Sequence, residues 1–255
     1  MGSSVTGSHA KINRWRTVLA IATVVFVAAL VALAVICFSY LQGQQKYGGL
    51  AEHVDLQADD VSGFSIDWDA LRAVNPDVVA WVYIPGTNVN YPVARGKDNE
   101  YYLSHDFAGE EGWLARYGSV FMDYRNDPSW SDAAYFLYGH HMSDGSMFSA
   151  IAEMADQKRF DAERAVYLLS PSASFKLRTF SLVHCAADEQ IVQTGFASAA
   201  DMAAYIQDKI DRSVVDVGEI PAADGIAKSF AFATCDNVSD GRYVLYAYEE
   251  NEIEG

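Results

Sequence analysis

The sequence FAFATCDNVSDGRYVLYAY, residues 230–248, has the pattern of two strands joined by a turn. Phenylalanines alternate with alanines in its first half, which is the two-residue period of a strand. The turn-forming run 236–241 then leads into a second strand that begins at Arg242. If this hairpin closes without a bulge, Cys235 and Arg242 face each other across the two strands, with β-carbons about 4.5 to 5.5 Å apart. The stretch therefore predicts a β fold in which one thiol lies beside one guanidinium.

Strand patterns also occupy much of the chain before this hairpin. Six further segments are apolar or alternate with period two: residues 78–84, 89–93, 119–122, 134–138, 166–169 and 175–183. With the two strands of the hairpin they make about eight. Many short strands separated by turns are typical of a β-barrel or sandwich. We therefore predict a mainly β (α+β) fold with helices packed outside the strands.

Three helices are also predicted, a short one before the first strand and two that interrupt the strands. Asp67 can cap a short helix that Asn75 and Pro76 would end. Ser198, followed by Asp201, supplies a capping box for a longer one. Apolar residues recur at helical spacing in two sets, Met147, Phe148, Ile151 and Met154, and then Met202, Tyr205, Ile206 and Ile210.

Residues 18–40 form an uncharged apolar run near the N-terminus. As a helix this run would extend roughly 34 Å, enough to cross a hydrocarbon core of about 30 Å. A cleaved signal peptide is the alternative, but the run is longer than the usual apolar region of a signal, and no A-x-A site follows it. Lys11, Arg14 and Arg16 precede the run and only Lys46 closely follows it, which predicts a cytoplasmic N-terminus. We expect a cytoplasmic segment at 1–17, a transmembrane anchor at 18–40, a spacer at 41–62 and an extracytoplasmic domain at 63–255.

Charge and cysteine usage exclude several classes of protein. The formal net charge is -16, with 34 acidic and 18 basic residues. Such a chain would repel phosphate backbones, so nucleic-acid binding is not expected. The three cysteines, Cys37, Cys185 and Cys235, are too few and too scattered for a disulfide framework. No C-x-x-C motif and no helical pair of histidines occurs, so no metal site is expected.

The thiol of Cys235 is the candidate nucleophile. A thiolate is the reactive form of cysteine, and an adjacent positive charge such as Arg242 favours it. The guanidinium could also stabilise an oxyanion in a tetrahedral intermediate. The alternative is an ordinary buried cysteine beside a surface arginine, and the local pattern alone leaves both interpretations open.

A nucleophilic cysteine also needs an acid for the leaving amine, and histidine is the usual one. His140 and His141 follow an apolar strand and a glycine, at a strand end where loops build sites. His184 adjoins Cys185, but neighbours on a strand point to opposite faces, so this pair makes a poor dyad. We expect Cys185 to be a small buried side chain. The other three histidines are poorer candidates: His9 before the span, His53 in the spacer and His105 in a polar loop.

Several motifs together resemble the class B sortases, over roughly residues 67–248. The run YGHHM at 138–142, followed by DGSMF at 144–148, resembles their histidine motif, and its first histidine, His140, matches the catalytic one. The other matching motifs are NYPV at 90–93, GKDN at 96–99 with YYL at 101–103, GSVFMDYRN at 118–126, and Thr234-Cys235 with Arg242 on the next strand.

The resemblance implies an eight-stranded sortase β-barrel and a cysteine transpeptidase of class B. It implies Cys235 as nucleophile, His140 as proton-transfer partner and Arg242 as oxyanion stabiliser. Substrate contacts are expected at Thr234, Ala233 and Tyr138. Helix 198–210 resembles the class B insertion between strands six and seven. No metal or organic cofactor is implied.

The resemblance also implies substrates and a location. A secreted protein would be cleaved after a threonine in a C-terminal sorting motif, and its acyl group would pass through a thioacyl enzyme to an amine of a peptidoglycan precursor. The membrane anchor would hold the enzyme at the surface of a Gram-positive cell. Three alternatives stay open: a pilus-polymerising sortase that uses a pilin lysine, a cysteine peptidase, and an inactive peptide-binding module. No apolar span follows Tyr248, which favours wall anchoring over polymerisation.

Three positions near Cys235 bear on its expected substrate contacts and chemistry. Ala231 and Ala233 stand where sortases often have leucine and a hydroxyl residue, which affects the expected substrate contacts and not the chemistry. An acid near the cysteine or histidine has been proposed as an orienting group in some sortases. Asp236 would be the nearest candidate here.

Overall fold

The structure, a computed structural model, describes residues 8–55, 64–111, 117–235 and 241–250, and only the backbone of residues 8–13 and of Cys235. The chain forms two compact units, residues 1–44 and 45–255. The helices are α1 (Ser8–Ala51), α2 (Trp68–Val74), α3 (Tyr101–Ser104), α4 (Ser149–Glu153), α5 (Gln157–Ala162), α6 (Ala199–Asp211) and the 3-10 helix η3 (Ala223–Gly225).

The described part of the first unit, residues 8–44, is helical. It lies within α1, where Arg14–Ala51 is long and apolar enough to cross a membrane, with a mean hydropathy of 3.0 in its most apolar window. Its apolar side chains are exposed along the span, including Val24 and Phe26. Length, composition and exposure make α1 a candidate membrane anchor.

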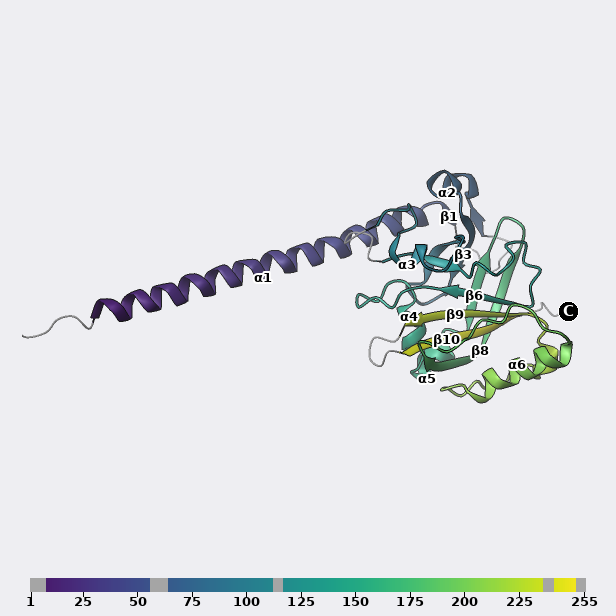
Figure 1. Cartoon of the computed structure of the whole chain (residues 1–255). Helices are drawn as coiled ribbons and strands as arrows, with labels where there is room; N and C mark the ends of the chain where they lie inside the picture. The colour runs from purple at the N-terminus through teal and green to yellow at the C-terminus, as the bar shows by residue number, and fades with distance from the viewer. Residues whose placement is uncertain (1–7, 56–63, 112–116, 236–240, 251–255) are drawn as a thin grey trace, which may run out of the picture. The chain divides into compact units, whose positions relative to one another are not determined.

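The second unit is built on a closed β-barrel in the strand order β10-β8-β7-β3-β4-β5-β6-β9 (Figure 1). Two of the eight strand pairs, β4 with β5 and β6 with β9, are parallel, and the other six are antiparallel. A separate two-stranded ladder joins β1 to β2. The strands are β1 (Val54–Asp55), β2 (Ser65–Ile66), β3 (Val78–Tyr83), β4 (Asn90–Ala94), β5 (Val120–Met122), β6 (Ala134–Tyr138), β7 (Ala165–Leu169), β8 (Ser174–Ala186), β9 (Ser229–Cys235) and β10 (Gly241–Glu249). The predicted eight-stranded barrel with peripheral helices is confirmed.

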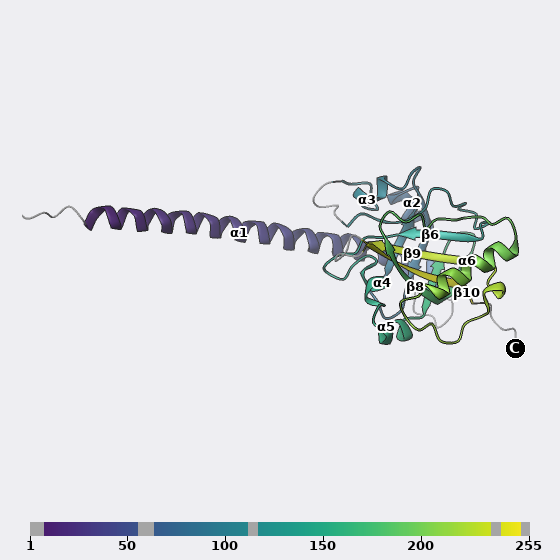
Figure 2. The same cartoon turned by 60° about the horizontal axis from the view of Figure 1, so that its bottom comes forward.

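Both faces of β9 are buried, which explains its alternation of large and small side chains. Phe230 and Phe232 are fully buried on one face, where Phe230 stacks on Tyr135. The alanines on the other face belong to the cluster that includes Tyr205 and Ile206 of α6 (Figure 2). Small residues on that face let the helix pack closely over the strands.

The helix caps follow the sequence signals in two of the three predicted helices. Asp67 caps α2 by accepting a hydrogen bond from the amide of Ala70, and Asn75 ends that helix. The Ser198 hydroxyl accepts the amide of Asp201 at 3.2 Å and donates to the Asp201 carboxylate at 2.9 Å. Helices α2 and α6 are therefore confirmed with their caps.

The helix predicted from Met147 begins later than its spacing suggested. Met147 has a positive φ of 54° and pairs through its backbone with His141, and α4 starts only at Ser149. The prediction was wrong for Met147 and Phe148 because both are fully buried for another reason, as part of the loop that follows β6. The apolar residues at helical spacing are buried there in a loop, so the spacing alone did not indicate a helix.

Candidate active site

The register of three neighbouring strands brings the predicted catalytic residues to one end of the barrel. Strand β10 pairs with β9 without a register shift, and Arg242 lies opposite Cys235, as the hairpin pattern predicted. Strands β6 and β9 run parallel, with Tyr138 opposite Ala233. His140 and Cys235 each follow that pair by two residues, and parallel strands end at the same rim. Cys235 and Arg242 therefore face each other on β9 and β10, and His140 follows the end of the adjacent strand β6 at the same rim of the sheet.

A cleft of about 310 Å³ opens at this rim. Its described lining residues are Asn99, Leu103, Phe121, Tyr138, Gly139, His140, Ala233, Thr234 and Arg242. Five of the six residues predicted for the site are among them. The side chain of the sixth, Cys235, and the whole of Asp236 lie outside the described residues.

Sequence reasoning missed Asn99, Leu103 and Phe121 as parts of the cleft. All three lie in motifs that carried the resemblance, at 96–103 and 118–126, but their side chains have no obvious chemistry. Sequence similarity therefore marked the motifs that contain these residues, but it did not show which residues of each motif face the cleft.

His140 is oriented by a backbone carbonyl. Its Nε2 lies 2.7 Å from the carbonyl oxygen of Leu103. A carbonyl oxygen can only accept, so Nε2 must carry a hydrogen. In the neutral ring the basic nitrogen is then Nδ1, which is the atom that can take and return a proton at the cleft. Leu103 thus contributes to this site through its backbone, which side-chain reasoning could not predict.

The loop after His140 is tied to the barrel at several points. The amide of Met147 donates to the Tyr91 hydroxyl at 2.9 Å, and burial raises the pKa of Tyr91 to about 12, which keeps that hydroxyl neutral. The amide of Phe148 donates to the carbonyl of His140 at 2.9 Å. A β-carbon at Gly139 would come within 2.7 Å of the Phe148 ring, so glycine is required where the loop leaves β6. These contacts hold His140 in place in the absence of substrate.

Gly118 makes room for the imidazole, and its replacement is the first testable prediction. A β-carbon at Gly118 would lie 2.7 Å from Cδ2 and 2.8 Å from Nε2 of His140, and its φ of +55° disfavours any other residue. We expect Gly118→Ala to displace the ring from the Leu103 carbonyl and to lower kcat/KM about 10- to 100-fold. Steady-state peptide kinetics, with thermal unfolding alongside, would measure this loss.

Gly218→Ala is the matched control for this substitution. Gly218 has a similar φ of +61°, and a β-carbon there would meet nothing within 4 Å. Both variants should therefore lose about 1 kcal/mol of stability from backbone strain. Gly118→Ala should lose more, because its β-carbon would also lie 2.9 Å from the backbone oxygen of Tyr102, and only Gly118→Ala should lose activity. Equal activity in the two variants would contradict the role assigned to Gly118.

Arg242 lies between two cysteine positions in the sheet. Its partner on β9 is Cys235, and its partner on β8 is Cys185. The guanidinium donates from Nη2 to the carbonyl of Ala187, just beyond the end of β8. This contact holds the side chain at the rim, where it lines the cleft.

Cys185 is the buried cysteine that the sequence predicted. Its side chain is 7% exposed, whereas the neighbouring His184 is exposed. Burial, helped by the nearby Glu189, raises the pKa of the Cys185 thiol and disfavours its reactive form. The prediction that Cys185 is a small buried side chain is confirmed, and the alternation along β8 places the exposed His184 on the opposite face.

Comparison with known proteins identifies the family. No protein-family model matches the sequence. The chain is 32% identical over 178 residues to sortase B of Listeria monocytogenes, a match that covers 69% of this chain and 70% of that protein. The chain belongs to the class B sortases.

Solved structures of class B sortases share the fold. Sortase B of Bacillus anthracis in complex with AAEK1 has a TM-score of 0.71 and 27% identity, covering 83% of this chain and 98% of that one. The Staphylococcus aureus sortase B–substrate complex has a TM-score of 0.70 and 25% identity, covering 83% and 97%. This class B sortase is therefore a cysteine transpeptidase on an eight-stranded closed barrel, as the sequence predicted.

Proposed function

We propose that this class B sortase cleaves secreted proteins after a threonine in a C-terminal sorting motif and joins the acyl part to an amine of a peptidoglycan precursor. The observation that carries the proposal is the strand register, which brings the facing positions Cys235 and Arg242 to the same end of the sheet as His140, two residues beyond β6. A cleft lined by His140 and Arg242 opens at this end. Membership of the class B sortases supports the reaction type. The Staphylococcus aureus sortase B–substrate complex, which has the same fold, supports peptide binding.

In the proposed mechanism, the Cys235 thiolate attacks the carbonyl carbon of the scissile amide. The oxygen becomes an oxyanion that the Arg242 guanidinium stabilises. Collapse of this intermediate breaks the carbon–nitrogen bond, and protonated His140 gives its Nδ1 proton to the leaving amine. The product of this half-reaction is a thioester between Cys235 and the substrate.

The second half-reaction reverses these roles. His140, now neutral, takes a proton from the incoming amine, whose nitrogen attacks the thioester carbonyl. A new amide forms and the Cys235 thiolate leaves. One amide is exchanged for another, so no ATP, metal or organic cofactor is needed.

Thr234 is proposed to contact the substrate at the cleft wall. The residue is 3% exposed and lines the cleft, and its hydroxyl has no hydrogen-bond partner within the described chain. Ala233 and Tyr138, on the same wall, are proposed as further contacts.

The membrane anchor is proposed to lie at residues 18–40, with residues 1–17 in the cytoplasm, 41–62 as the spacer and 63–255 outside. The apolar composition of α1 and the cluster of Lys11, Arg14 and Arg16 before the span support this topology. It would hold the cleft where secreted proteins emerge from the membrane.

Product analysis with and without an added amine tests the proposal. The full-length chain in detergent micelles is incubated with a library of sorting-motif peptides, with and without triglycine, and the products are read by mass spectrometry. We expect a peptide cleaved after threonine, a ligated product that requires triglycine, and a thioacyl adduct on the peptide fragment that contains Cys235. Cleavage into acid products alone, even with a peptidoglycan-type amine or a lysine side chain present, would indicate a peptidase. No turnover of any peptide would indicate a binding module.

A further inference from the structure

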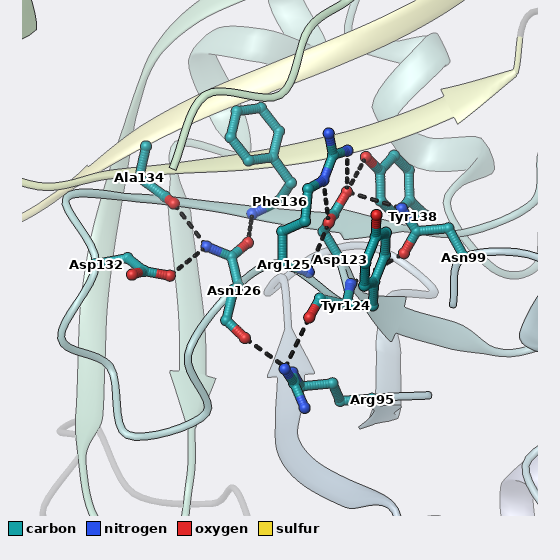
Figure 3. Close-up of polar contacts among 10 residues, drawn as sticks. All are labelled: Arg95, Asn99, Asp123, Tyr124, Arg125, Asn126, Asp132, Ala134, Phe136 and Tyr138. Carbon is teal, nitrogen blue, oxygen red and sulfur yellow. Dashed lines mark hydrogen bonds and ion pairs between the residues drawn. The ribbon is translucent and has the colours of Figure 1, made fainter. Parts of the chain in front are cut away.

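Asp123 is a buried carboxylate directly behind the cleft wall. It follows β5, is fully buried, and receives five hydrogen bonds (Figure 3). Its Oδ2 accepts from Asn99 Nδ2 at 2.8 Å, from the Tyr138 hydroxyl at 2.9 Å and from Arg125 Nη2 at 2.8 Å. Its Oδ1 accepts from the amide and the Nε of Arg125, both at 2.9 Å. Two of its partners, Asn99 and Tyr138, line the cleft.

These contacts keep the carboxylate ionised. Burial alone would raise the pKa of Asp123, but the hydrogen bonds from Arg125, Asn99 and Tyr138 outweigh it and lower that pKa below its usual value. An ionised carboxylate has no proton to donate, so each of its five contacts must be a bond that it accepts. The direction of every hydrogen bond in the cluster is therefore fixed.

The fixed direction decides what Tyr138 offers to the cleft. A tyrosine hydroxyl has one hydrogen and two lone pairs, and the hydrogen is committed to Asp123. The hydroxyl can then only accept from a group that enters the cleft. Burial, reinforced by the charge of Asp123, raises the pKa of Tyr138, so this side chain is neutral at physiological pH.

Asn99 is fixed in the same way. Its Oδ1 accepts from the amide of Tyr124 at 3.0 Å, and its Nδ2 donates to Asp123. These two bonds determine which end of the side-chain amide is which. Among the described residues Nδ2 donates only to Asp123, which leaves its second N–H available as a donor.

We infer that Asp123 is a positioning residue for acyl transfer, because it makes Tyr138 an obligate acceptor and Asn99 a donor on the cleft wall. An acceptor and a donor on one wall match the N–H and C=O groups of an extended peptide backbone. Asp123 thus determines where the cleft wall offers an acceptor and where it offers a donor to the peptide backbone. Asp123 does not itself contact the peptide. The inference rests on the proposed location of substrate binding in this cleft.

The same loop provides a matched control carboxylate. Asp132 accepts from the amide of Asp127 and from Asn126 Nδ2, both at 2.8 Å (Figure 3). Arg95 binds the carbonyls of Asn126 and Tyr124 at 2.8 and 2.7 Å, on the side of the cluster away from Tyr138. Asp132 therefore stabilises the loop without contacting a described residue of the cleft.

The test compares Asp123→Ala, Asp132→Ala, Tyr138→Phe and the double variant Asp123→Ala/Tyr138→Phe in the full-length chain in detergent. The substrate is the peptide that the wild-type chain turns over fastest, with triglycine as amine. We expect Asp123→Ala and Tyr138→Phe each to raise KM about 10-fold with little change in kcat, because each removes a binding hydrogen bond. Asp132→Ala should lower the Tm and leave KM unchanged.

The double variant separates positioning from simple stability. If Asp123 acts through the Tyr138 hydroxyl, adding Tyr138→Phe to Asp123→Ala should raise KM by less than about twofold, because contacting residues that act together are not additive. Additive effects, or an unchanged KM in a folded Asp123→Ala variant, would overturn the inference. If the Asp123→Ala variant fails to fold, an unchanged KM in the Tyr138→Phe variant would be enough to overturn the inference. Failure of the proposed function can be distinguished from failure of this inference, because the wild-type chain itself would then form no ligated product.

Discussion

Replacing Cys235 by alanine should abolish peptide cleavage and ligation, with kcat/KM falling by at least about 10⁴-fold. The proposed mechanism passes through a thioester on this sulfur, and alanine offers no atom that can form it. The same variant should still bind peptide, because the described cleft residues are unchanged. Ligation kinetics and the mass of the trapped enzyme would measure the first effect, and peptide fluorescence polarisation the second.

Cys185→Ala is the control for this prediction, since it removes the other cysteine of the barrel unit. Cys185 is buried, its thiol has a raised pKa, and it lies opposite Arg242 from the other side. We expect this variant to retain activity within about threefold. A Cys185→Ala variant as inactive as Cys235→Ala would mean that the wrong thiol has been assigned.

Replacing His140 by alanine should lower kcat/KM by about 10³- to 10⁴-fold, because the leaving amine then departs without a proton donor. The barrel should remain folded, because the loop is also held through Met147 and Phe148. Imidazole added to the assay should restore part of the rate, since it can occupy the space vacated beside Gly118. Single-turnover measurements of thioester formation would show whether the first half-reaction is the one that slows.

His141→Ala is the neighbouring control. His141 pairs through its backbone with Met147, a contact that alanine keeps. Activity close to that of the wild type is expected. Loss of activity in His141→Ala together with normal activity in His140→Ala would reverse the assignment of the two histidines.

The hairpin at the C-terminus was predictable because its two strands are close in sequence. Only a short turn separates Cys235 from Arg242, and continuous alternation on both sides leaves one register that buries the phenylalanines. The parallel pairing of β6 with β9 is different. It joins segments about ninety residues apart, and nothing local in either strand specifies its partner. The strand pattern therefore placed His140 and His141 at a strand end, and only the resemblance assigned His140 to the same site as Cys235.

The short helices were the least predictable elements. Helix α3 has only four residues, too few for a helical period to accumulate, yet it supplies the carbonyl of Leu103 that orients His140. Helix α5 buries only Phe160, and a single buried residue shows no helical period in the sequence. Asp156 caps this helix. The role inferred for Asp123 depends on a buried network, and sequence similarity marked its motif without showing which groups it bonds.

Closure of the sheet limits how a peptide can be held. In the closed barrel each of the eight strands is already paired on both sides, so the described barrel has no edge strand to which a peptide could add as a ninth strand. Backbone ladders bind peptides with little regard to sequence, whereas a cleft must select its occupant through the side chains of its wall. Substrate choice in this protein should therefore change with single substitutions at wall positions such as Asn99 and Leu103, while the barrel beneath them stays the same.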